Sequence, residues 1–223
     1  MTLVYGSTLL STIDGLSLEL ASSGVEPIRS SEGKIAYSLN ALAVPVGKAL
    51  RQGVGKTVPK ATEMMDYLQM LVRKHKEHTM QWITPVGVPV VNWAEGSVVK
   101  QVHIRSMGIH TIWMSYNNGK YDTRAASNGV VPNFVHSLDS AHLCMTINDC
   151  DASILPIHDS FATHPCDVQK MHDSLRKTFA QMYSSYSTEA FTEFNGIDIT
   201  EYPIPSKGNL DINSVLDAPY MFC

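Results

Sequence analysis

The chain has 223 residues and a mass of 24.6 kDa, enough for one large domain or two small ones with a buried core. Apolar residues make up 44% and charged residues 17%, which excludes an intrinsically disordered chain. The net charge of −4 argues against a free-standing protein that binds nucleic acid by phosphate contacts alone, although it permits a local basic patch. No apolar run is long enough for a membrane helix, and no targeting segment is visible.

The chain begins with the apolar segment Met1–Val4, which runs into Tyr5 and Gly6. An apolar run followed by Gly is typical of the end of a helix. No capping residue precedes this run, so we expect either that the chain was cut or that its structural partner lies elsewhere. A Tyr at a helix end can stack on a base and contact a sugar hydroxyl, or it can simply complete a core beside a capping Gly.

Three helices are expected next. Residues 12–20 have a weak helical period, and residues 35–50 are rich in Ala, Leu and Val, which predicts a buried helix interrupted at Pro45. A stronger helix follows Pro59, where apolar residues recur at helical spacing: Ala61, Met64, Met65, Leu68, Leu71 and Val72. Positively charged side chains near residue 74 would lie at the C-terminal end of this helix, where the negative end of the helix dipole favours them.

Residues 81–116 are rich in β-branched and aromatic side chains and predict strands. Thr84–Gly87 has turn composition and separates two short strands. Residues 98–105 alternate in part between apolar and polar side chains, and 109–116 form a second β-prone run. Asn118-Gly119 is predicted to end that run as a turn.

Pro132 is predicted to open a helix with one apolar stripe, formed by Phe134, Leu138, Ala141 and Met145. His136 and Asp139 are three residues apart and lie on a different face, so the carboxylate can orient the imidazole. Such a pair is either a surface hydrogen bond or part of a helix face directed at a ligand groove.

Residues 153–157 and 161–164 predict two short strands joined by His158-Asp159-Ser160, which together form a hairpin. A carboxylate at a hairpin tip suits a hard cation such as Mg²⁺, although many turn Asp residues only bond their own backbone. Asp167 is then predicted to cap a helix, and a short last helix precedes an aromatic end.

The four cysteines, Cys144, Cys150, Cys166 and Cys223, form no CxxC pair and no zinc-finger spacing with the histidines. Four cysteines in a chain of this length are too few for a disulfide scaffold. We therefore expect free thiols in a reducing compartment.

Taken in order, these blocks resemble the carboxy-terminal part of the bacteriophage- and mitochondrial-type single-subunit DNA-directed RNA polymerases. The family's fingers motif ends in Tyr-Gly, its "PNFxHSxDxxH" helix is similar to Val131–His142, and a palm motif with a metal-binding Asp is similar to Ile157–Phe161. Residues 82–90 and 207–210 are also similar to family segments. Family-A DNA polymerases typically place Glu after His-Asp, where this chain has Ser160, and they lack the His-Ser-x-Asp helix.

The resemblance implies an α+β fold that is part of the polymerase right hand. Residues 1–130 would be a fingers-like portion, and residues 131–223 a palm portion with the catalytic hairpin and the terminal segment. It implies template-directed nucleotidyl transfer from NTPs to an RNA 3′ end, with Mg²⁺, a DNA template and the RNA product as partners. The compartment would be the cytoplasm of a phage host or the mitochondrial matrix, with no membrane attachment.

The resemblance also assigns roles to single residues. Asp159 would be the catalytic metal ligand, and His158 would shape its turn. Tyr5 and Gly6 would face the incoming nucleotide, and His136 would contact the minor-groove side of the new base pair, where the 2′-hydroxyl is exposed.

Two family features have no counterpart here. The Arg and Lys upstream of the family's Tyr would precede Met1, and no Asp in this chain has the context of the family's other metal-binding Asp. We therefore expect a fragment or a subunit that needs a complementary N-terminal portion and is inactive by itself. Two alternatives stay open: a non-catalytic remnant or binding subunit with the same fold, and a metallohydrolase that uses His136, His142, His158 and Asp159.

Overall fold

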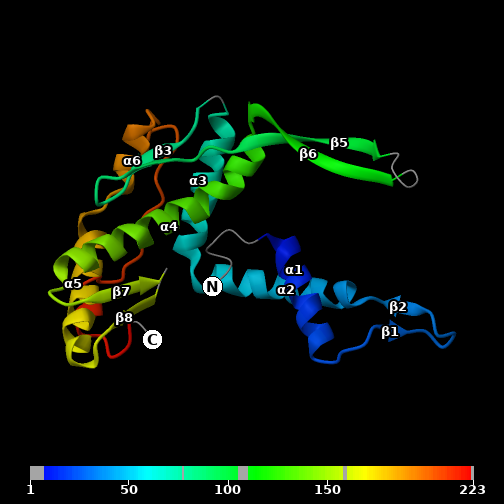
Figure 1. Cartoon of the computed structure of the whole chain (residues 1–223), viewed down its shortest axis with the longest axis horizontal. Coiled ribbons are helices and arrows are strands. Elements are labelled where there is room, and N and C mark those ends of the chain that lie inside the picture. The colour runs from blue at the N-terminus through cyan, green and yellow to red at the C-terminus, as the bar shows by residue number, and fades with distance from the viewer. Residues whose placement is uncertain (1–7, 77, 105–109, 158–159, 222–223) are drawn as a thin grey trace. The chain divides into compact units, whose positions relative to one another are not determined.

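The computed structural model describes residues 8–76, 78–104, 110–157 and 160–221. These residues form helices and two-stranded antiparallel sheets, which agrees with the predicted α+β class (Figure 1). The chain divides into two compact units, residues 1–66 and 67–223, and each is described by itself. No helix among the described residues is long and apolar enough to cross a bilayer.

The first unit is built on helices α1 (Leu9–Ser22) and α2 (Leu39–Thr57), with the strand pair β1 (Ile28–Arg29) and β2 (Ile35–Tyr37) between them. Hydroxyl side chains cap both helices: the Thr8 oxygen accepts from the Ser11 amide, and the Ser38 oxygen accepts from the Ala41 amide. The two helices pack closely at Gly47, where an added Cβ would lie 3.1 Å from Ile13 Cγ1.

The prediction for residues 35–50 is wrong in three respects. Residues 35–37 form β2, α2 runs through Pro45 without interruption, and only Ala43 and Gly47 of this helix are buried. Pro45 has no backbone N–H, so the carbonyl of Ala41 lacks its usual helical hydrogen-bond donor. Ala41 and Pro45 are both exposed, so water can satisfy that carbonyl and the helix continues.

Helix α3 (Pro59–Lys74) is the helix predicted near Pro59, and it contains the unit boundary. Strands β3 (Gln81–Ile83) and β4 (Pro89–Val91) pair around the predicted turn, where the Gly87 amide donates to the Thr84 carbonyl at 2.8 Å. Gly87 has a φ of +84°, which a side chain rarely adopts.

Strands β5 (Glu95–Ile104) and β6 (His110–Tyr121) form a long antiparallel ribbon. The predicted turn at Asn118-Gly119 is wrong, because β6 continues to Tyr121. The register shifts here as in a β-bulge, Gly119 has a φ of +70°, and its amide donates to Glu95 Oε1 at 2.9 Å. A Gly with positive φ therefore marks a bulge rather than the end of the strand.

Helix α4 (Thr123–Asp149) begins nine residues before the predicted start at Pro132. Asp122 is the actual cap, since its carboxylate accepts from the amides of Arg124 and Ala125. Pro132 lies inside the helix, and the carbonyl it deprives of a donor belongs to the exposed Asn128. The boundary predicted between residues 130 and 131 therefore falls within one continuous helix.

The last third of the chain contains the predicted hairpin, β7 (Ile154–Ile157) and β8 (Ser160–Thr163), and four helical segments. These are the 3₁₀ turn η1 (Pro165–Asp167), α5 (Val168–Ser185), α6 (Thr188–Phe194) and the predicted short last helix α7 (Ser214–Asp217). Asp167 precedes α5 as predicted but makes no capping bond, because its carboxylate pairs with Lys170 at 2.9 Å. Figure 1 shows α4 running from the base of the ribbon to α5.

Candidate functional site

The hairpin β7–β8 brackets the predicted catalytic dipeptide. Ile157 and Ser160 are paired across the strands, and His158 and Asp159, which join them in the sequence, lie outside the described residues. Their predicted roles are therefore not tested by geometry. The described strands have two unlike faces, since Phe161 and its cross-strand partner Pro156 are half-buried whereas Ile157 is exposed.

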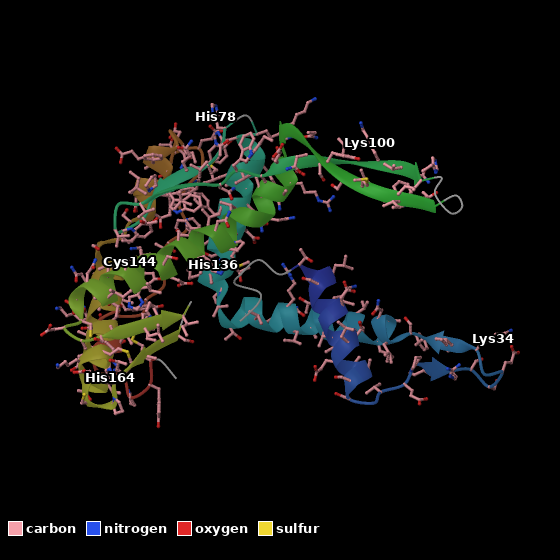
Figure 2. The ribbon with its side chains drawn as sticks, viewed as in Figure 1. Lys34, His78, Lys100, His136, Cys144 and His164 are labelled. Atoms are coloured by element: carbon pink, nitrogen blue, oxygen red, sulfur yellow. The ribbon has the colours of Figure 1, made fainter. Side chains whose placement is uncertain are left out.

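His136 lies near the middle of α4, as Figure 2 shows, and its side chain is exposed. Asp139 is exposed as well, and Phe134, Leu138 and Ala141 are buried. The predicted division of this helix into an apolar stripe and a polar face is confirmed. The direct His136–Asp139 pairing stays a prediction.

Ser137 fixes the rotation of α4 about its axis. It is buried, its hydroxyl donates to the Phe134 carbonyl at 2.7 Å, and the same oxygen accepts from Trp82 Nε1 at 2.9 Å. The Trp82 ring lies 5.7 Å, centroid to centroid, from both Phe134 and Phe191. Because Ser137 is held inward, the adjacent His136 is directed to the exposed side.

A second polar contact fastens α4 to the segment after β4. Asn92 is buried, its Nδ2 donates to the Ala126 carbonyl at 3.0 Å, and its Oδ1 accepts from Asn133 Nδ2 at 2.9 Å. Asn133 is part of the motif quoted above, but periodicity gave no sign that Asn92 is its partner. The burial of a polar residue such as Asn92 could not be predicted from the sequence, because it depends on hydrogen-bond partners that lie far away in the chain.

His142 is the most buried imidazole of the α4 motif. It is 6% exposed, and its Nε2 lies 2.9 Å from the Leu175 carbonyl on α5. Burial lowers the pKa of His142 below its ordinary value, while the Leu175 carbonyl and the charge of Asp139 act in the opposite direction. The ring is therefore neutral at pH 7, with its proton on Nε2 donated to Leu175.

The described residues contain no group of three or more His, Cys, Asp or Glu side chains that could hold a metal ion. Cys144, Cys150 and Cys166 are free thiols, as predicted. The metallohydrolase alternative uses His142, whose Nε2 lies 2.9 Å from a backbone carbonyl, so this ring could bind a metal ion only through Nδ1. Tyr5 and Gly6, like Asp159, lie outside the described residues.

Comparison with known proteins decides the family. Residues 1–196 match the family of DNA-dependent RNA polymerases. The chain belongs to this family. It is 33% identical over 230 residues to the DNA-directed RNA polymerase of Pseudomonas phage phiKMV, and 29% identical over 232 residues to the mitochondrial DNA-directed RNA polymerase 1B of Nicotiana tabacum. Over 155 residues, 66% of its length, it is 34% identical to the chloroplastic/mitochondrial polymerase 2 of Arabidopsis thaliana.

These polymerases are much longer than the region they share with this chain. The whole chain aligns with 27% of the phage polymerase and 22% of the tobacco one, and the Arabidopsis match covers 15% of that protein. The relatives are nucleotidyltransferases, and the chain corresponds to a part of them. The resemblance to phage and mitochondrial polymerases is confirmed, and the roles of single residues stay predictions.

Proposed function

We propose that this chain is the C-terminal catalytic portion of a DNA-directed RNA polymerase, which adds nucleotides from NTPs to an RNA 3′ end on a DNA template. The family match over residues 1–196 is the observation that carries this proposal. The matched residues span the His136 helix and the His158-Asp159 segment. Residues 1–130 would contribute to the fingers, and residues 131–223 to the palm.

A complementary N-terminal portion would complete the enzyme, on the same or on a separate polypeptide. About three-quarters of the phage relative has no counterpart in these 223 residues, which align with 27% of it. That portion would supply the other metal-binding carboxylate, the phosphate-binding Lys and the rest of the template channel. The proposed compartment is a phage host's cytoplasm or the mitochondrial matrix.

Asp159 would bind Mg²⁺ in this assembly. A carboxylate is the ligand that Mg²⁺ prefers, and the paired residues Ile157 and Ser160 flank the dipeptide on both sides. Bound Mg²⁺ would activate the RNA 3′-hydroxyl and neutralise charge on the leaving pyrophosphate. His158 would shape the turn that presents the carboxylate.

Three further residues would position the nucleotide. Tyr5 and Gly6 would face the incoming NTP, and His136 would contact the minor-groove side of the new base pair. The exposure of His136 supports this role, because a side chain that touches a base pair cannot be packed in the core. The bond between Ser137 and Trp82 would hold it in that orientation.

The decisive experiment is RNA synthesis by the polymerase assembled from this chain and its own complementary portion. Asp159→Ala should abolish Mg²⁺- and template-dependent synthesis, because a carboxylate ligand is lost. Asp173→Ala is the matched control, since the Asp173 side chain is 65% exposed on α5, and it should retain activity.

Two outcomes would contradict the proposal. Full activity of the Asp159→Ala assembly would show that this carboxylate is not the metal ligand. A correctly assembled wild-type complex that never makes RNA would favour the non-catalytic alternative, a remnant or binding subunit with the same fold.

A further inference from the structure

We propose that His142 is a positioning residue that holds the hairpin β7–β8, whose strands flank Asp159 in the sequence, against helices α4 and α5. This inference rests on the proposed function, because it concerns the support of the proposed metal ligand. It assigns a role to the last histidine of the α4 motif, which the proposed chemistry itself does not use.

Three elements meet at the His142 imidazole. The residue belongs to α4, and its Nε2 donates to the carbonyl of Leu175 on α5. Its ring lies 5.4 Å from the Phe179 ring on α5 at 86°, and 6.5 Å from the Phe161 ring on β8 at 68°, both as centroid separations in edge-to-face geometry. One side chain therefore contacts both the helix pair and the hairpin.

Phe161 connects this contact to the proposed ligand. It follows Asp159 by two residues and pairs across the hairpin with Pro156. Both belong to the half-buried face, while Leu155 and Ile157 on the other face are 61% and 57% exposed. The attachment of the hairpin to its unit thus depends on the half-buried face, to which Phe161 contributes its ring.

An imidazole suits this position better than a purely apolar ring. The bond from Nε2 to Leu175 fixes the rotation of the ring and so keeps its edge-to-face geometry with the two phenylalanines. Because burial keeps the ring neutral, it occupies the interior without the cost of a buried charge. A phenylalanine would fill the space but would leave the ring free to turn and the Leu175 carbonyl without this donor.

The α4–α5 contact one turn further along offers a matched control. Thr146 is fully buried, and its hydroxyl lies 3.0 Å from that of Thr178 on α5. This contact also joins the same two helices by a buried polar bond, here between two hydroxyls, and no described contact joins Thr146 to β8. Thr146→Val should therefore weaken the helix pair and leave the hairpin in place.

The test compares His142→Phe, His142→Gln and Thr146→Val in the assembled polymerase. His142→Phe should raise the Mg²⁺ concentration for half-maximal rate, or lower kcat, by about 10–100-fold, as the loss of outer-shell support does at other metal sites. The KM for NTP should change little. His142→Gln separates the two contacts: its amide nitrogen is as many bonds from Cα as Nε2 and can donate to Leu175, but it has no ring to contact Phe161, so it should not recover the loss.

A second measurement does not depend on activity. In the 223-residue chain, His142→Phe should accelerate hydrogen exchange at the β8 amides, whereas Thr146→Val should not. If a His142 variant fails to assemble, Phe161→Leu removes the same contact from the other side and should reproduce the β8 effect.

The proposal is overturned if His142→Phe lowers stability as Thr146→Val does, while the Mg²⁺ dependence and the exchange of β8 stay at wild-type values. Failure of the proposed function is distinguishable, because it would appear as no RNA synthesis by the wild-type assembly. Faster β8 exchange in the Phe variant would then still establish the contact but not its catalytic purpose.

Discussion

Helix α4 and the β5–β6 ribbon follow one another in the sequence but use their side chains in opposite ways. Ten residues of α4 are buried, and four of them are polar: Ser127, Ser137, His142 and Thr146. Among the described residues of the ribbon only Gly96 is buried, while seven large apolar residues are exposed: Val98, Val99, Ile104, Ile112, Trp113, Met114 and Tyr116. Figure 2 shows the ribbon's Lys100, whose ammonium lies 5.9 Å from the Tyr116 ring centroid.

The difference shows that a neighbouring element, rather than apolarity, decides what is buried. Each buried polar residue of α4 finds a partner on another element, such as Trp82 for Ser137 and Leu175 for His142. These bonds offset the desolvation of the polar groups. Most described contacts of the ribbon are between its own two strands, such as those of Lys100 with Tyr116 and His103 with Thr111, and Tyr121 at its base also packs on Trp93.

The largest effect of losing a polar contact is expected at Ser137. Ser137→Ala would leave the buried indole N–H of Trp82 without an acceptor, at a cost of about 1–3 kcal/mol in the free energy of unfolding. Urea unfolding of the chain would measure this loss. The control is the Trp82→Phe variant, which lacks the indole N–H donor. In that variant Ser137→Ala should lower the free energy of unfolding by clearly less than in the wild type. Equal costs in both backgrounds would show that the bond contributes nothing to α4.

A smaller effect is expected from pH, through His142. Its pKa is lowered in the folded chain, so the unfolded chain binds a proton more readily. The stabilisation is complete above the ordinary pKa of about 6.5 and is lost as pH falls from there through the folded value. Unfolding free energies between pH 7.5 and 5 should show this slope in the wild type and not in His142→Gln.

The carboxylate of Asp149, which joins α4 to α5, does not obscure that window. Hydrogen bonding and charge from Lys177 hold the pKa of Asp149 below its ordinary value of 3.8, so its stabilisation is present above that pH and is lost only in stronger acid. A slope between pH 7.5 and 5 that persists in the glutamine variant would assign the effect to another histidine.

The sequence predicted the local features of this region better than the tertiary ones. The apolar stripe of α4 and the first ribbon strand follow from the period of their apolar residues, and the second ribbon strand follows from its β-prone composition, because both signals depend only on neighbours along the chain. The burial of Ser137 and His142 did not follow, since it depends on Trp82, 55 residues away, and Leu175, 33 residues away. The helix start was predicted wrongly at Pro132. A proline can lie inside a helix where the carbonyl that loses its N–H donor is exposed to water.

The candidate site was predictable only as a motif. The order of the blocks identified the family, which the match over residues 1–196 confirms. Local sequence could place His158 and Asp159 between two strands, and the paired residues Ile157 and Ser160 agree with this. The support of the hairpin by His142 could not be predicted, because it requires the packing of α4, α5 and β8 together.

The smallest effect is expected on the ribbon. Trp113 is 68% exposed, so Trp113→Ser should change the unfolding free energy by no more than about 0.5 kcal/mol, although a large aromatic ring is lost. Leu138→Ala on α4 removes a smaller group that is only 7% exposed and should cost about 2–5 kcal/mol, since it leaves a cavity. Urea unfolding of both variants would rank them. If the tryptophan proved the costlier loss, the ring would be buried in solution, and the contrast between the packed helix and the unpacked ribbon would fail.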